Sequence, residues 1–130
     1  MKPPVHLDPV QAYDRIPRQF GAVSAQRQAY LDGIDRLIVA EVVPGSSSLL
    51  DVGAGSGQRA ARIAEACGID DRVLLEPSAA MRKQWHPGTY GWPIRAEELG
   101  AKRGSFDVVL CLWNVLGHIF PERARIAVLR

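Results

Sequence analysis

The sequence predicts an α/β protein in which a parallel sheet carries helices on both faces. Short apolar runs alternate with amphipathic helical patterns, and a glycine-rich turn joins the first run, at 49–52, to the helix that follows it. The most apolar segment lies late in the chain, at 106–113. Strands that alternate with helices form βαβ units, and right-handed crossovers between them give a Rossmann-like arrangement.

The first expected helix begins near Ser24, a residue type that caps helices well. A loose arm over 1–12, with three prolines and few apolar residues, precedes it. One face of this helix is expected to pack on the core, because apolar residues recur on it at helical spacing: Leu31, Ile34, Ile38 and Val42. The helix is expected to end before Pro44.

A buried strand over 49–52 and the glycine turn lead into the second helix. Small and apolar residues share one face of that helix: Ala60, Ala61, Ile63, Ala64 and Cys67. Gly68 is placed to terminate it. The second strand covers 73–75 and ends on Glu76, and a short helix is expected from there to about Gln84.

The last third of the chain predicts four further elements. A short strand is expected near 90–94, inside an aromatic loop rich in glycine and proline, and one helical turn at 97–101. The apolar run at 106–113 predicts a central strand. Pro121 suits the first turn of a last helix over 122–130.

Composition limits the kinds of function that fit the chain. It has 130 residues, room for one domain, and a net charge of +2, too small to indicate a surface for nucleic acid. No apolar run approaches the roughly 20 residues of a membrane span, and no signal peptide is recognisable. Two cysteines, Cys67 and Cys111, cannot form a disulfide framework. We expect a cytoplasmic protein that binds neither nucleic acid nor membrane.

The glycine turn and an acid at the end of the next strand indicate a nucleoside ligand. Gly53, Gly55 and Gly57 lie between a strand and a helix, where the backbone can approach a ligand closely. A dinucleotide site needs its third glycine at position 58, which is Gln58, so an NAD-dependent dehydrogenase is disfavoured. The carboxylate of Glu76 can accept hydrogen bonds from both hydroxyls of a ribose.

Four sequence blocks, taken in order, carry a family resemblance. They are LLDVGAGSG at 49–57, VLLEPSAAM at 73–81, AEEL at 96–99 and SFDVVL at 105–110. At this spacing they resemble the class I S-adenosylmethionine-dependent methyltransferases. The resemblance implies S-adenosylmethionine as the cofactor and methyl transfer to a small-molecule acceptor by in-line displacement.

The resemblance also implies roles for individual residues. Asp51 and the glycine turn would hold the amino-acid end of the cofactor, with Arg27 clamping its carboxylate, and Glu76 would hold the ribose. His118 is the candidate catalytic base. The other implied cofactor contacts are Gly53, Ala54, Gly55 and Gly57 in the turn, Pro77, Ser78 and Met81 beside the adenine, Ala96 and Glu97 at the adenine edge, and Asn114 near the methionine moiety.

The resemblance divides the chain into two parts. Residues 24–130 would form an incomplete S-adenosylmethionine-binding methyltransferase domain, and residues 1–23 an N-terminal arm. Tyr13 and Phe20 in that arm are candidates for a lid over the cofactor.

Three departures from the family pattern bear on function. Arg95 stands where the family often places an acid. The sequence at 113–116, WNVL, lacks the Asn/Asp-Pro-Pro-aromatic block of enzymes that methylate DNA bases, which favours a small acceptor. The family's sheet continues for three more strands, so we expect the sheet of this chain to be truncated after the fourth. A homodimer or another partner chain would then cover that apolar edge. The alternative function is a truncated, non-catalytic module for cofactor binding or interaction.

Overall fold

The computed structural model describes residues 8–101 and 105–129. In chain order the elements are α1 (Pro9–Arg15), α2 (Pro17–Gln26), α3 (Gln28–Glu41), β1 (Ser48–Val52), α4 (Gln58–Cys67), β2 (Asp71–Leu75), α5 (Ala79–Arg82), β3 (Gly91–Trp92), the 3₁₀ helix η1 (Ala96–Ala101), β4 (Val108–Leu110), the 3₁₀ helix η2 (Val115–His118) and α6 (Glu122–Val128). No helix in these ranges has the length and hydrophobicity needed to cross a bilayer.

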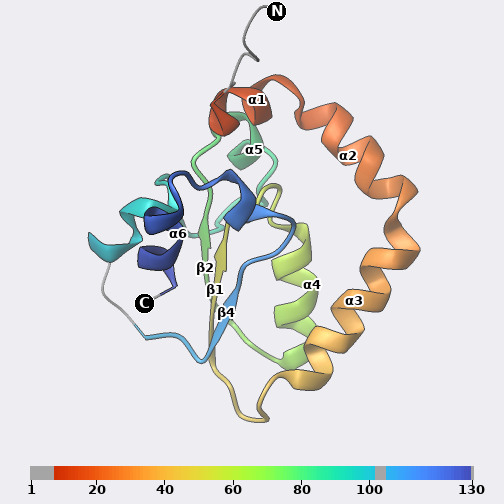
Figure 1. Ribbon diagram of the computed structural model, residues 1–130. Coiled ribbons are helices and arrows are strands. Elements are labelled where there is room, and N and C mark those ends of the chain that lie inside the picture. Colours follow the sequence, from red (N-terminus) through yellow and green to blue (C-terminus); the bar gives the residue numbers. More distant parts are fainter. Residues whose placement is uncertain (1–7, 102–104, 130) are drawn as a thin grey trace, which may run out of the picture.

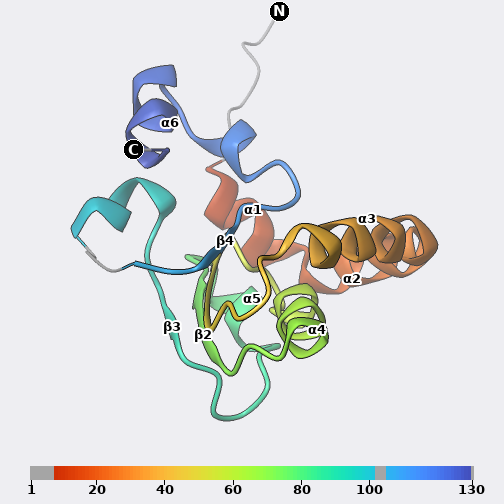
Figure 2. The ribbon, with the colours of Figure 1, turned by 90° about the horizontal axis from the view of Figure 1, so that it is seen from below.

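The four described strands form one parallel sheet in the order β3-β2-β1-β4. Leu50 of β1 lies opposite Val73 of β2 on one side and Val109 of β4 on the other. In Figure 1 β2, β1 and β4 run side by side, and Figure 2 shows α3 and α4 on one face of the sheet and α6 on the other. The predicted parallel sheet with helices on both faces is therefore confirmed.

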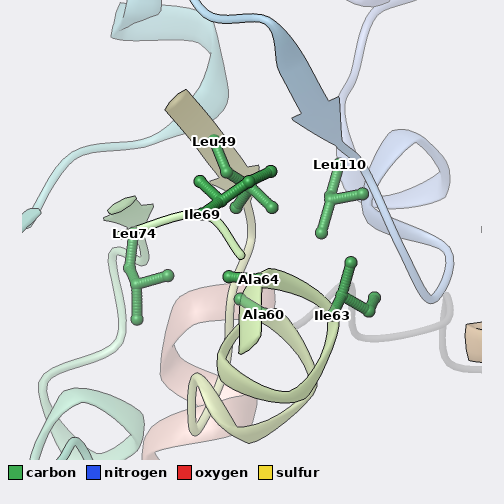
Figure 3. Packing of buried hydrophobic residues seen from close by; sticks show 7 residues of the cluster. All are labelled: Leu49, Ala60, Ile63, Ala64, Ile69, Leu74 and Leu110. Atoms are coloured by element: carbon green, nitrogen blue, oxygen red, sulfur yellow. The ribbon is translucent and has the colours of Figure 1, made fainter. Parts of the chain in front are cut away.

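One core lies between the sheet and α4 (Figure 3). Its buried members are Leu49, Ala60, Ile63, Ala64, Ile69, Leu74 and Leu110. Alanines on α4 let the helix approach the strands closely, and Leu49 and Ile63 are completely buried between them. Burial of a side chain of this size stabilises the fold by about 1.5–3 kcal/mol.

The second core lies on the opposite face, because successive strand residues point to opposite sides. It contains Leu50, Val52, Val73, Leu75, Ala96 and Ile119. Side chains from the segments around η1 and α6 close over it, among them Leu99 and Val128. With both faces covered, β1 carries Asp51 as the one charged residue among its buried positions.

The first helices differ from the prediction. Ser24 lies inside α2 rather than at a helix start, and α3 begins only at Gln28. The expected loose arm is also wrong from Pro9 onward, because α1 begins there, with the Asp8 side chain accepting a hydrogen bond from the Val10 amide at 2.8 Å. The proline taken as a sign of irregular chain occupies the first turn of a helix, where its missing N–H costs nothing. Residues 1–7 of the predicted arm lie outside the described part.

The expected central strand at 106–113 is much shorter and lies at the edge of the described sheet. Only Val108–Leu110 pair, and they pair with β1 alone. Trp113 and Asn114 have positive φ angles of 61° and 59°, which turn the chain out of the extended conformation. The apolar sequence therefore continues past the strand as an irregular segment over the cavity described below.

Other predicted elements are confirmed with small shifts in their bounds. The strands at 49–52 and 73–75 correspond to β1 and β2, and α4 ends on Gly68 in the left-handed conformation, with φ 69°. The short helix expected up to Gln84 is α5, which Ser78 caps. The expected turn at 97–101 is η1.

Candidate functional site

The glycine turn follows β1 and is fixed to the end of β2. The amides of Gly53 and Ala54 both donate to the Leu75 carbonyl, at 2.8 and 2.9 Å. The φ angles of Gly53 and Gly55 are 73° and 56°, a region that residues with a Cβ rarely adopt. A Cβ on Gly53 would lie 2.5 Å from a methyl group of Val115, so the turn also needs glycine for space.

Glu76 joins this turn to the chain after β2. One carboxylate oxygen accepts the Gly55 amide at 2.8 Å, and the other accepts the Ser78 amide at 2.8 Å. The residue is 7% exposed, and this burial raises the pKa of its carboxyl, although the two backbone hydrogen bonds oppose the shift. Since a carboxylate offers about four acceptor sites, Glu76 keeps capacity for a ligand after holding the turn.

Asp51 is the second acid at this end of the sheet. It lies one residue before the end of β1, is 3% exposed, and its Oδ1 has no hydrogen-bond partner among the described residues. Burial raises its pKa to about 7; the positive charge of Arg59 opposes this shift and the negative charge of Glu76 adds to it. Buried polar atoms normally have partners, so Asp51 is equipped to accept a donor from a ligand.

A cavity of ≈ 170 Å³ lies over the carboxyl ends of β1 and β2. Ligands of open parallel sheets bind at this end of the strands. Predicted site residues that line it are Asp51, Gly53, Ala54, Gly55, Glu76, Pro77, Met81, Ala96, Glu97 and His118. The structure thus brings together ten residues chosen from four separate sequence segments.

Four predicted site residues do not line the cavity. Gly57 is the N-cap residue before α4, and Ser78 is fully buried, where its hydroxyl donates to Asp14 at 2.6 Å. Asn114 is the cap residue before η2, and its two neighbours in the sequence line the cavity. Arg27 lies with its guanidinium 5.6 Å from the centre of the Trp113 ring. Gly57 and Ser78 have evident structural roles, and Arg27 packs on an aromatic face.

Aromatic side chains from distant segments close the cavity on the side of α1 and α2. The Tyr13 hydroxyl lies 3.2 Å from Nε2 of His118, and their rings meet edge to face. Phe20 contacts both Tyr13 and Trp113, with ring centres 5.7 and 6.3 Å apart. The predicted lid residues Tyr13 and Phe20 therefore both line the cavity.

The sequence-based prediction of the site did not include the polar residues of α3 and α4 that line the cavity. Arg59 and Arg62 line the cavity, as does Gln28. A usable signal was present, because residues that directly follow a glycine turn after β1 must lie at the same end of the sheet as the turn. Arg95 also lines the cavity and pairs with Asp8 at 2.6 Å.

Comparison with known proteins identifies the family. Residues 50–129 match the model of the methyltransferase domain family. The chain belongs to this family. No curated protein matches the domain.

Several solved structures resemble the domain. The sugar N-methyltransferase KedS8 from Streptoalloteichus is 26% identical, with a TM-score of 0.61 over 76% of this chain and 40% of its own. CalS10, an amino pentose methyltransferase from Micromonospora echinaspora whose structure contains S-adenosylmethionine, is 20% identical, with a TM-score of 0.69 over 86% and 49%. DesVI from Streptomyces venezuelae is 22% identical, with a TM-score of 0.63 over 95% and 52%. The domain thus spans about half the length of these proteins.

Proposed function

We propose that the domain binds S-adenosylmethionine and takes part in methyl transfer to a small-molecule acceptor by in-line displacement. The observation that carries the proposal is the cavity that joins the glycine turn to two buried carboxyls, Asp51 and Glu76. Membership of the methyltransferase domain family supports methyl transfer, and the likeness to the sugar methyltransferase KedS8 supports a small acceptor.

The residues present fit this cofactor. It carries an ammonium group, a sulfonium and a ribose, and the unpartnered Oδ1 of Asp51 suits the ammonium. Glu76 retains acceptor sites for the ribose hydroxyls, and the glycine turn leaves room for a close approach of the ligand to the backbone. Pro77 and Met81 would flank the adenine, with Ala96 and Glu97 at its edge.

When bound, S-adenosylmethionine supplies an electrophilic methyl group on a good leaving group, so alignment of the acceptor matters more than activation. His118 is placed to take a proton from an acceptor at Nε2, the atom that now faces the Tyr13 hydroxyl. Tyr13 and Phe20 would exclude water from the cavity as parts of an N-terminal lid at 1–23. Asn114 would act near the methionine moiety.

A titration with S-adenosylhomocysteine tests the proposal. We expect micromolar binding by isothermal calorimetry and weaker binding of NADH, because the glycine turn lacks the third glycine of a dinucleotide site at Gln58. Tighter binding of NADH would refute it. Methyl transfer itself is then tested by release of S-adenosylhomocysteine with amino sugars as candidate acceptors.

A second candidate function, an interaction module that needs a partner chain, rests on an exposed groove between α3 and β4. Apolar side chains there are well exposed, with Leu37 at 69% and Val109 at 59%. Light scattering separates the two functions: a folded dimer without ligand binding would favour the module. The cytoplasmic location stays a prediction, and both cysteines are free thiols.

A further inference from the structure

A buried aspartate holds the arginines that face the cavity from α4. Asp35 of α3 is 7% exposed, and its Oδ1 accepts from both Nε and Nη2 of Arg59, the former at 3.0 Å. Its Oδ2 lies 3.3 Å from Nη2 of Arg62. The Arg59 side chain is 19% exposed, whereas that of Arg62 is 41% exposed. Arg59 is therefore the more firmly enclosed of the two.

This arrangement leaves donors of Arg59 available. A guanidinium has five N–H donors, and Asp35 engages the edge formed by Nε and Nη2. Nη1 makes no hydrogen bond to any described residue, although Arg59 lines the cavity. An arginine that is oriented by one carboxylate and has donors to spare is suited to bind a second carboxylate.

Asp51 provides a buried carboxyl group in the same cavity. Its Oδ1 is buried without a partner, and Arg59 is close enough for its charge to lower the pKa of the Asp51 carboxyl. The salt bridges of the described residues nevertheless include none between these two side chains. The cavity thus presents a carboxyl group and a guanidinium group that do not form a salt bridge with each other.

We propose that Arg59 binds the carboxylate of the amino-acid portion of an adenosyl ligand, next to the ammonium group already assigned to Asp51, and that Asp35 is a positioning residue for Arg59. The inference rests on the proposed function and deepens it. It moves the carboxylate contact from Arg27, which the family resemblance suggested, to α4. Arg27 packs on Trp113 and does not line the cavity.

Two ligands that differ only at the amino-acid end test the inference. S-adenosylhomocysteine carries that end, and 5′-methylthioadenosine keeps the nucleoside and sulfur without it. In Arg59→Gln the Kd for S-adenosylhomocysteine should rise by about 10- to 100-fold, the effect of a lost hydrogen bond to a charged group. The Kd for 5′-methylthioadenosine should change by less than about twofold, because that ligand lacks the carboxylate.

Matched variants separate contact from general structure. Arg72→Gln removes an exposed arginine from β2 and should change neither Kd. Asp35→Asn should shift the same selectivity ratio as Arg59→Gln, but less strongly, and Asp35→Glu should restore part of it. If these variants only disturbed the structure, the binding of both ligands would weaken by the same factor, and that result would overturn the inference.

The wild-type measurements distinguish the two levels of the proposal. If neither ligand binds, the proposed function fails and the inference fails with it. If both ligands bind equally tightly, the proposed function stands and the inference is overturned. If Arg62→Gln alone shifts the ratio, the carboxylate contact belongs to Arg62 and the assignment to Arg59 is refuted.

Discussion

Replacement of Asp51 by asparagine should change how the stability of the domain depends on pH. Burial raises the pKa of this carboxyl from 3.8 to about 7, so the folded chain retains a proton that the unfolded chain has released over that interval. The contribution of Asp51 to stability is therefore complete below pH 4 and is lost as pH rises through about 7. The separation of the two pKa values corresponds to about 4 kcal/mol, at roughly 1.36 kcal/mol for each pKa unit.

Urea denaturation of both proteins at several pH values measures this effect. The amide of the variant cannot ionise, so the free energy of unfolding of Asp51→Asn, minus that of wild type, should rise by about 3 kcal/mol between pH 5 and pH 8. The difference between the two proteins is the useful quantity, because the other titrating groups are common to both. Asp70→Asn, at an exposed position, is the matched control for the chemical change itself. A difference that does not vary with pH would refute the reasoning.

Four further substitutions test the glycine turn and its anchors, one of them a control. Gly53→Ala and its control Gly68→Ala both place a Cβ at positive φ, which costs about 1–2 kcal/mol of stability. Only the Cβ at position 53 would meet Val115, so only Gly53→Ala should also lose affinity for S-adenosylhomocysteine. Equal binding by the two variants would count against the effect of this contact. Trp85→Phe removes the 2.8 Å hydrogen bond from Nε1 to a carbonyl of the turn and should lower the free energy of unfolding in urea by about 1 kcal/mol; an unchanged midpoint would show that this bond is dispensable. Glu76→Gln replaces one accepting oxygen with a donor and should weaken the binding of S-adenosylhomocysteine, measured by calorimetry, by about 1–3 kcal/mol. Unaltered affinity would show that Glu76 does not contact the ligand.

The parts of the fold that depend on local sequence could be predicted. β1, the glycine turn and α4 follow from a short apolar run, glycines at positions of positive φ, and a helical face of small residues. Glu76 and Asp51 could be placed at one end of the sheet because parallel strands share the direction of their carboxyl ends. These features need no knowledge of distant contacts.

The misplaced elements depend on contacts that the sequence does not display. The run at 106–113 is apolar because it serves two purposes: Leu110 enters the core beside α4, and Trp113 lines the cavity after the chain has turned. Hydropathy alone cannot separate these two surroundings. Likewise, the role of Ser78 depends on Asp14, which lies 64 positions earlier in the chain and approaches only after folding.

Hydrogen bonds attach the glycine turn to the end of β2, so one wall of the cavity is tied to the sheet. The Leu75 carbonyl accepts hydrogen bonds from two amides of the turn, and Glu76 accepts one from a third, so hydrogen bonds join β1, the turn and β2. The opposite wall of the cavity is built differently. That wall is held by aromatic contacts between α1, α2 and the segment after β4, which involve no hydrogen bond between strands. Movement of the N-terminal helices would therefore change the shape of the cavity and leave the sheet intact.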